Sequence, residues 1–286
     1  MEIDAGRFTV RLARDEQDIA AAQRLRYRVF VEELGASASD EERALRREID
    51  EYDPHFEHLI LIDKETRSDD PLDRVAGAYR LMTTTRAKAG IGFYGQTEYD
   101  LSLLETCGRD AVELGRSCVG AEVRGGAAMH LLWTGLGEFV TARKIEIMFG
   151  VASFHGADPE PLAHALSFLH HNHLAPEDLR VRARPENYAA MDLLPADEVD
   201  RKQAARQIPA LIKAYLRLGG FVGEGAWVDH DFNTVDVCLL MDTARMVARY
   251  RDFYGKEAKP AAGRGGAMAI PGAGSGDKAG GEGAGA

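Results

Sequence analysis

Charged residues interrupt four segments of the chain that are otherwise apolar enough to be buried. The segments are RYRVF (26–30), IDEYD (49–53), AGAYRL (76–81) and ELGRSCV (113–119). A lone carboxylate or guanidinium inside a protein costs on the order of several kcal/mol, so such groups normally pair with each other or with a charged ligand. The pattern therefore predicts that acids and arginines from distant segments converge on a binding or catalytic site.

The composition sets limits on the class of protein. The chain has 286 residues, 45% of them hydrophobic, which is enough for one large domain or two small ones. A formal net charge of −11 argues against a general nucleic-acid binder, because neutralising phosphates requires an excess of lysine and arginine. The three cysteines lack CxxC spacing, which favours reduced thiols. Without an apolar leader or a membrane-spanning stretch, we expect a cytoplasmic protein that contacts membranes only peripherally.

Hydrophobic spacing predicts a mixture of strands and helices. The expected helices lie within 15–35, 122–144, 158–172 and 208–222, and the expected strands are 8–13, 58–63, 74–84, 111–119, 145–154 and 234–242. Strands that pair in sequence and are followed by a strand-helix-strand crossover indicate a mixed sheet with helices on its faces. The charged segment 36–48 is expected to be a mobile or helical excursion at the surface.

These elements predict a single domain over residues 1–254, with a helical and loop insertion at about 158–207. Residues 255–286 are rich in glycine and alanine and almost without large apolar side chains. Such a segment buries too little surface to offset the entropy of ordering it. We therefore expect a disordered tail.

The element order, and above all ELGRSCV followed by an Arg, Gly and Ala loop that opens into a helix, resembles the GNAT (acyl-CoA N-acyltransferase) fold. The resemblance implies an α+β architecture, with a mixed, mostly antiparallel twisted sheet flanked by helices. The chain would add a helical C-terminal extension to it. In that fold, the strand corresponding to 111–119 and the start of the next helix hold the acyl donor.

The four charged segments together resemble the GNAT branch that contains acyl-homoserine-lactone synthases and the ornithine N-acyltransferases of ornithine-lipid synthesis. Segments 161–182 and 208–240 resemble the extension of the ornithine acyltransferases. This resemblance implies transfer of a 3-hydroxyacyl group from acyl carrier protein to the α-amino group of L-ornithine, giving lyso-ornithine lipid. It implies no further cofactor, and an amphiphilic product makes contact with the inner membrane an expectation.

The resemblance also assigns roles to the charged residues. Glu113 is the candidate base that takes a proton from the amine, directly or through water. Arg80 and Arg116 would hold the acidic cluster or the substrate carboxylate. The structural alternative is that Glu113 and Arg116 form only a salt bridge with each other.

Other residues are candidates for binding ornithine. Asp50 and Asp53 could receive its δ-ammonium, although a turn or a helix cap would also account for these acids. Arg26 and Phe30 lie one helical turn apart and are expected to form a lid or an ion-pair partner over that turn, with core packing the simpler interpretation of Phe30.

The acyl donor is expected at the end of the strand and at the loop that follows. Backbone N–H groups near Ser117, Cys118 and Val119 would stabilise the oxyanion, and the candidate donor-binding residues on the loop and helix are Arg124, Gly125 and Trp133. The loop only partly matches the phosphate loop of coenzyme A-dependent members. That departure is compatible with a donor carried on acyl carrier protein. Basic residues at 180–184 and 201–206 could dock this acidic partner or anionic lipid headgroups, and a solvated face is the alternative.

Two other functions remain open on the sequence alone. One is a lactone synthase that uses S-adenosylmethionine, and the other is a lipid-binding module of the same fold without catalysis. We predict no metal site, because the histidines at 170, 171 and 173 lack a carboxylate or cysteine at ligand spacing.

Overall fold

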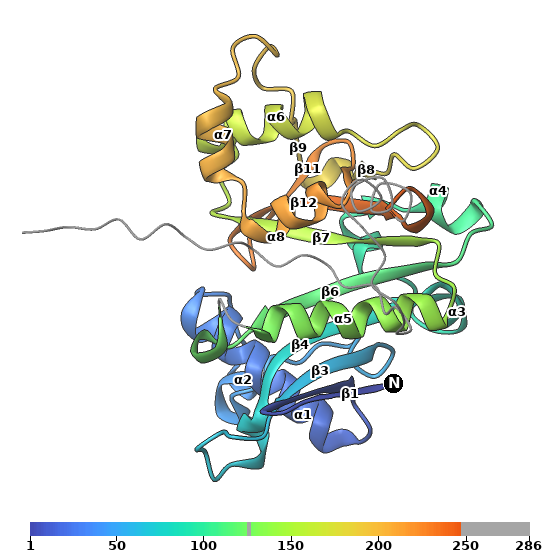
Figure 1. Cartoon of the computed structure of the whole chain (residues 1–286). Coiled ribbons are helices and arrows are strands. Elements are labelled where there is room, and N and C mark those ends of the chain that lie inside the picture. The colour runs from blue at the N-terminus through green and yellow to red at the C-terminus, as the bar shows by residue number, and fades with distance from the viewer. Residues whose placement is uncertain (125–126, 247–286) are drawn as a thin grey trace, which may run out of the picture.

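The fold is built on one large sheet (Figure 1). The computed structural model describes residues 1–124 and 127–246. The sheet follows the order β1 (Glu2–Ala5), β2 (Phe8–Leu12), β3 (Glu57–Asp63), β4 (Val75–Thr83), β6 (Ala111–Val119), β7 (Ile147–His155), β12 (Thr234–Asp242), β11 (Ala226–Asp229), β9 (Tyr188–Ala189), and β10 (Phe221–Val222) pairs with β12. A separate ribbon pairs β5 (Tyr99–Asp100) with β8 (Arg182–Ala183).

Among the paired strands of the described residues, only β6 and β7 run parallel. They are joined by the long helix α5, as a parallel pair requires a crossover. The predicted mixed, mostly antiparallel sheet with a strand-helix-strand crossover is therefore confirmed. The strand predicted at 111–119 has the bounds of β6, whereas the edge hairpin partner β1 was not predicted.

Helices cover both faces of the sheet. They are α1 (Glu16–Arg26), α2 (Asp40–Leu45), α3 (Thr84–Ala89), α4 (Ser102–Thr106), α5 (Ala127–Ala142), α6 (Ala163–His173), α7 (Arg201–Gln207) and α8 (Ala210–Arg217). Short 3-10 turns are η2 (Pro71–Arg74), η3 (Tyr94–Thr97), η4 (Ala121–Val123), η5 (Glu160–Leu162) and η6 (Pro185–Asn187), and η1 (Tyr27–Glu33) is a π-helix that continues α1. The predicted helix at 15–35 is thus α1 followed by one π-helical segment, a geometry often found at functional sites.

The side chains of β6 divide between two apolar cores. Val112 and Leu114 belong to the large core formed with α5, α6 and α8, whereas Ala111 belongs to a second core with residues of α3, η3 and α4. Figure 1 shows α5 lying along the sheet, where it packs against β2, β3 and β4. Because successive side chains of a strand point to opposite faces, Glu113 faces away from α5.

The parallel pairing of β6 and β7 is short. It runs from Ala111 and Ile147 to Glu113 and Phe149, and beyond this point the two strands diverge (Figure 1). An extra residue in β6 between Gly115 and Cys118 forms a bulge against β4, and Arg116 there has a φ of 49°. The bulge turns the strand away from β7 and redirects its side chains.

Several further predictions can be compared with these elements. The segment 36–48 does contain a surface helix, but Glu48 at its end is buried rather than exposed. The predicted tail at 255–286 lies outside the described residues. In the described part of the chain, no helix combines the length and apolar character needed to cross a bilayer.

Candidate active site

Three arginines and three carboxylates form a buried network on the face of the sheet that carries α1. Arg26 at the end of α1 is fully buried and binds Asp53 through two hydrogen bonds of 2.7 Å, and its Nε pairs with Glu48. Arg80 on β4 donates to both oxygens of Asp50 at 2.6 Å and lies 3.0 Å from Asp53. The network balances three positive against three negative charges.

Arg116 closes this network from β6. Its Nε donates to Oε1 of Glu48 at 3.0 Å, and its Nη2 lies 3.5 Å from Asp50. The predicted convergence of Arg26, Arg80 and Arg116 with the IDEYD turn is confirmed by these contacts. The position of Arg116 depends on the bulge. In a regular strand, alternation would place this side chain on the face of Val112 and Leu114, toward α5.

Burial and charge pairing act in opposite directions on the acids of the network. Burial opposes ionisation of Glu48, but the charges of Arg26 and Arg116 lower its pKa to about 2. Likewise, burial alone would raise the pKa of Asp53, and hydrogen bonding by Arg26 holds it well below its usual value. Both acids are therefore ionised at neutral pH and bound to arginines.

Asp53 is only 3% exposed, and its oxygens already accept hydrogen bonds from Arg26, Arg80 and Gln23. It has no free oxygen directed outward, so the geometry does not favour Asp53 as a direct partner of an ornithine ammonium. Asp50 is less buried, but it accepts from Arg80 and from two backbone N–H groups of its own turn. The Asp50 side chain therefore stabilises its own turn, and both acids are bound to arginines.

Glu113 lies beside this network but is held separately. Its two oxygens accept the backbone N–H groups of Tyr94 at 2.8 Å and Gly95 at 2.6 Å, at the start of η3. The alternative of a Glu113–Arg116 salt bridge is wrong, because Arg116 pairs with Glu48 and Asp50 instead. Glu113 is 1% exposed, and burial raises its pKa to about 7 even though both N–H groups favour the charged form.

Aromatic rings cover the arginines. The guanidinium of Arg80 lies 4.6 Å from the ring centroid of Phe56, and that of Arg116 lies 4.9 Å from Tyr94 and 4.5 Å from Phe232. Such contacts stabilise a desolvated cation and keep its plane fixed. Phe30 is half-buried and meets Phe232 edge-on, so it helps to position this ring, while the fully buried Arg26 is an ion-pair partner and not a lid.

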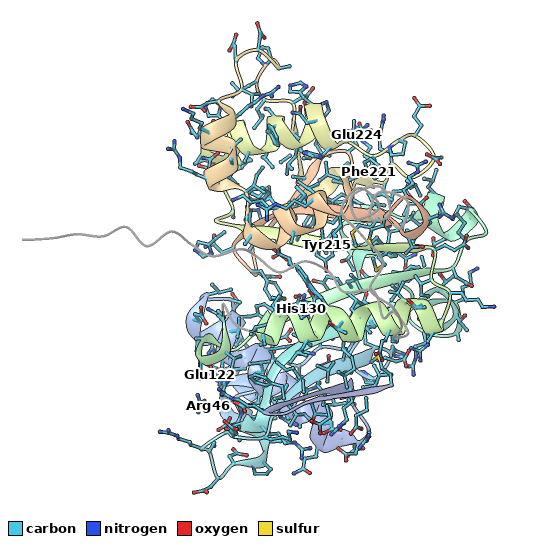
Figure 2. The ribbon with its side chains drawn as sticks, viewed as in Figure 1. Arg46, Glu122, His130, Tyr215, Phe221 and Glu224 are labelled. Atoms are coloured by element: carbon cyan, nitrogen blue, oxygen red, sulfur yellow. The ribbon has the colours of Figure 1, made fainter. Side chains whose placement is uncertain are left out.

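A small cavity of about 40 Å³ lies where β6 and β7 diverge. It is lined from the α5 face by Tyr79, Leu114 and Tyr215, and along the strands by Arg116 and Gly150. Figure 2 labels Tyr215 on α8, and its hydroxyl lies 3.3 Å from that of Tyr79. The cavity therefore reaches from the face that carries α5 and α8 to the bulge at the charged network.

A second, smaller cavity of about 10 Å³ adjoins the first and shares three of its residues, Met148, Tyr215 and Met241. Its other lining side chains are mainly apolar and include Trp133 and Leu136 of α5. The Nε1 of Trp133 donates to the Tyr79 hydroxyl at 3.1 Å, which fixes the indole at the junction of the two cavities. A chain of apolar side chains thus continues from the strand opening toward α5.

The structure places the candidate donor-binding residues unequally around this opening. Ser117 lines the first cavity, but Cys118 and Val119 are buried in apolar cores. Arg124 lies further away, where it pairs with Glu33 and donates to the carbonyl of Val119 at 2.9 Å. Gly125 lies outside the described residues.

Sequence reasoning missed several residues of the site. Glu48 was taken for part of a surface segment, although three arginines set against two aspartates called for a third acid. Tyr94 and Gly95, which hold Glu113, gave no signal because they contribute backbone N–H groups. Phe232 comes from a loop more than a hundred residues beyond Arg116, and no local pattern connects the two.

Comparisons with known proteins identify the family. Residues 25–134 match the family model of the acetyltransferase (GNAT) domain. The chain is 56% identical over 248 residues to the L-ornithine N(alpha)-acyltransferase of Rhodobacter capsulatus, an alignment that covers 86% of this chain and 94% of the relative. A protein of the same name from Brucella abortus is 42% identical over 255 residues, covering 88% and 90%. The chain belongs to the L-ornithine N(alpha)-acyltransferase family.

Membership of this family confirms the GNAT-like fold and the acyltransferase class that the motifs predicted. Among solved structures, FeeM, an N-acyl amino acid synthase from uncultured soil microbes, aligns over 85% of this chain and 94% of its own with 9% identity and a TM-score of 0.42. The AHL synthase LasI aligns over 82% and 89%, with 15% identity and a TM-score of 0.43.

Proposed function

We propose that this member of the L-ornithine N(alpha)-acyltransferase family transfers a 3-hydroxyacyl group from acyl carrier protein to the α-amino group of L-ornithine. The names of the relatives support the acceptor. The observation that carries the chemistry is a buried acid, Glu113, whose pKa is raised to about 7, beside the opening between β6 and β7.

The acceptor requires a base. The α-amine attacks a thioester carbonyl only in its neutral form, so a proton must leave the ammonium group before or during attack. Glu113 is suited to this role because a carboxyl group with a pKa of about 7 is largely ionised at slightly alkaline pH yet basic enough to accept the proton. The two N–H donors from Tyr94 and Gly95 hold its oxygens in place.

The donor enters from the other side of the sheet. We infer that the pantetheine arm and the acyl chain occupy the adjoining cavities lined by Tyr215, Met148 and Trp133. The thioester carbonyl then lies between the diverging strands, with the acceptor amine on the Glu113 face. Backbone N–H groups of the bulge near Arg116 and Ser117 no longer pair with β7 and would stabilise the oxyanion.

The reaction closes without a further reagent. The amine nitrogen forms a bond to the carbonyl carbon, the proton passes to Glu113, and the tetrahedral oxyanion collapses by breaking the carbon–sulfur bond. The nitrogen loses its second proton as the amide forms, this proton passes to the leaving thiolate, and Glu113 returns the first proton to water. The products are the amide and the free thiol of the carrier arm.

The identity of the donor carrier is supported by the loop that follows β6. Arg124 is engaged with Glu33 and with the carbonyl of Val119, so its guanidinium is not directed toward a pyrophosphate. A carrier-bound pantetheine has only a phosphodiester to hold, and acyl carrier protein is acidic. Exposed Arg201, Lys202 and Arg206 on α7 offer it a basic surface, and the amphiphilic product is expected to bring the protein into contact with the inner membrane.

A product assay tests this function. Purified protein is incubated with 3-hydroxyacyl-acyl carrier protein or 3-hydroxyacyl-coenzyme A, and with L-ornithine or S-adenosylmethionine, and products are identified by mass. We expect acyl-ornithine from the carrier-bound donor at the highest rate. An acylated lactone from S-adenosylmethionine, or no product from ornithine, would contradict the proposal.

A further inference from the structure

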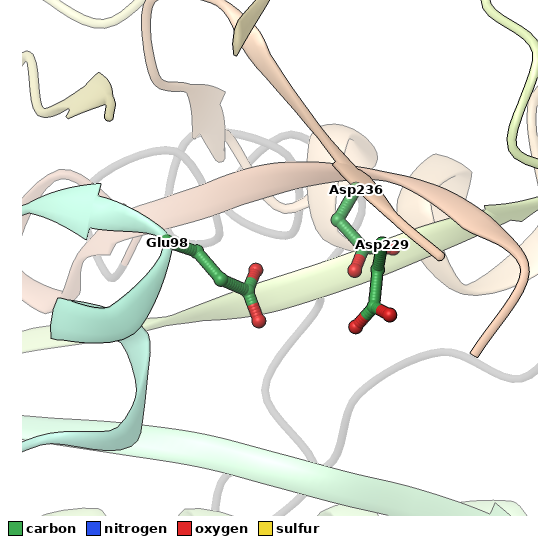
Figure 3. A group of neighbouring side chains, drawn as sticks. All are labelled: Glu98, Asp229 and Asp236. Carbon is green, nitrogen blue, oxygen red and sulfur yellow. The ribbon is translucent and has the colours of Figure 1, made fainter. Parts of the chain in front are cut away.

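A second group of acids lies near the active site but outside the arginine network. Glu98 follows η3, Asp229 ends β11, and Asp236 lies on β12. Their carboxylates point toward one another (Figure 3), with one oxygen from each lying within 4.8 Å of the others. Glu98 and Asp236 are only 3% and 4% exposed, whereas Asp229 is half-buried and opens the group toward solvent.

The acids of this group lack ion-pair partners among the described residues, and burial raises the pKa of both Glu98 and Asp236. In contrast to Glu48, Asp50 and Asp53, none of its three carboxylates forms a salt bridge with any residue in ranges 1–124 and 127–246. Buried oxygens on two of them, Oε2 of Glu98 and Oδ1 of Asp236, accept no hydrogen bond from these residues. Buried acids without partners are costly, and an arrangement of three is suited to a cation.

Two connections place the acid group next to the catalytic residues. The N–H of Glu98 donates to the carbonyl of Gly95, whose own N–H binds Glu113, so a single turn links the base to the acid group. On the other side, Asp229 accepts the N–H of Phe232 at 2.9 Å, and the ring of Phe232 lies over Arg116. The hydroxyl of Tyr99 donates to the backbone oxygen of Asp236 at 3.0 Å, and this hydrogen bond links the segment that carries Glu98 to β12.

We propose that Glu98, Asp229 and Asp236 bind the side-chain ammonium of the acceptor and so select a diamino acid. The inference rests on the proposed function and assigns the specificity of that same site. An α-amine at Glu113 and a terminal ammonium at the acid group belong to one short aliphatic substrate. The three carboxylates supply the negative charge and the free oxygens that an ammonium with three N–H donors requires.

Norvaline provides the direct comparison, because it has the carbon chain of ornithine without the terminal amine. We expect kcat/KM of the unaltered protein for L-ornithine to exceed that for L-norvaline by at least about a hundredfold, since a site built for a hydrogen-bonding group rejects an analogue that lacks it. Equal kcat/KM values would show that the acid group does not recognise the terminal amine of ornithine.

Neutral variants then test the named residues. Asp229→Asn retains an oxygen for the N–H groups of Asp231 and Phe232 and removes only the charge. This variant and Asp236→Asn should raise KM for ornithine about tenfold or more while kcat/KM for norvaline stays within about twofold. Asp231→Asn is the matched control, because it removes an exposed charge from the same turn and should leave both substrates unaffected.

Two results would overturn the assignment. If Asp229→Asn and Asp236→Asn lower activity toward both amino acids equally, the acids have only a structural role. If a chelator abolishes ornithine turnover and added Mg²⁺ or Ca²⁺ restores it, the acids hold a metal instead. Calorimetric binding of ornithine and norvaline without a donor separates this test from the proposed function, because the preference for ornithine must persist even if no acyl transfer occurs.

Discussion

Glu113 is buried, and two backbone N–H groups hold its carboxylate in place. Its neighbours on β6 are apolar, and the cost of burying its charge is reflected in a pKa of about 7. The backbone N–H groups of Tyr94 and Gly95 prevent the shift from going further. The protonation of this side chain therefore changes in the physiological pH range, as the proposed role of a base requires.

Replacing Glu113 by Gln should lower kcat by roughly a hundredfold or more, within the range of 10² to 10⁴ usual for a general base. Gln has a similar size but cannot take a proton from the amine. Steady-state rates with saturating donor and ornithine measure the effect. Circular dichroism and donor binding serve as controls, since Gln offers an NH₂ group to one of the two N–H donors and loses that hydrogen bond.

The pH dependence gives a second readout of Glu113. We expect kcat/KM for ornithine to fall on the acid side with an apparent pKa near 7, because protonated Glu113 cannot act as a base. The residual activity of Glu113→Gln should lack this acid limb. An acid limb that is unchanged in the variant would assign the titration to another group.

Arg26 provides the corresponding test for the ion-pair network. Arg26→Gln leaves Glu48 and Asp53 without their nearest cation, and breaking a buried pair in this way costs about 3–5 kcal/mol. Arg46→Gln is the matched control, because the Arg46–Glu32 pair is exposed (Figure 2) and should contribute about 1 kcal/mol at most. Urea unfolding of both variants measures the difference, and equal losses would contradict the structural role of Arg26.

Among the elements, the junction of β6 and β7 is the most constrained. A Cβ on Gly150 would lie 2.1 Å from the carbonyl oxygen of Leu114, so only glycine lets the strands meet here before they diverge. On the neighbouring strand, a Cβ on Gly115 would lie 4.0 Å from its nearest neighbour, the Nε of Arg80. The two glycines therefore form a matched pair of positions.

We expect Gly150→Ala to lower the free energy of unfolding by at least about 1–3 kcal/mol and to reduce activity, because the strands must move apart. Gly115→Ala should fold with nearly unchanged stability, since the added methyl group has room. Chemical denaturation and steady-state kinetics provide the two measurements. A Gly150→Ala protein as stable and active as Gly115→Ala would show that the junction adapts freely.

Among the elements, sequence patterns predicted the long strands but not the irregular backbone at the site. Apolar runs with defined ends, such as 111–119 and 234–242, identify strands because burial on both faces leaves a continuous signal. The bulge at Arg116 and the π-helix after Arg26 depend on tertiary contacts and leave no periodicity. Asp236 interrupts the apolar strand TVDVCLLMD, a signal of the same kind as the four charged segments, but its partners come from other parts of the chain.

At the scale of the whole molecule, two groups of acids respond to pH in opposite ways. Glu48 and Asp53 have lowered pKa values in the fold. The stability that they contribute is therefore fully present above their unfolded pKa values, 4.5 for Glu48 and 3.8 for Asp53, and it is lost as the pH falls below these values. Burial raises the pKa of Glu113 to about 7 and that of Asp236 to about 6. Between the unfolded values and these raised values the native state binds more protons, so stability declines as pH rises.

We therefore expect the free energy of unfolding to be greatest near about pH 5, to decrease toward pH 8 and to fall again below about pH 4. Urea unfolding at intervals between these limits measures the curve. Asp236→Asn should flatten its neutral limb without altering the acid limb. A curve that rises continuously from pH 5 to pH 8 would contradict the raised pKa values of the buried acids.

The opening between β6 and β7 connects the two faces of the sheet. Under the proposed function, the amino acid and the carrier arm approach from opposite faces of the sheet, so we expect that either can bind first. The proposed amide product, however, would have its amino-acid head on one side of the sheet and its hydrocarbon chain on the other. One end of this product would have to pass between the strands to leave, so we expect product release to become the slow step for long acyl chains.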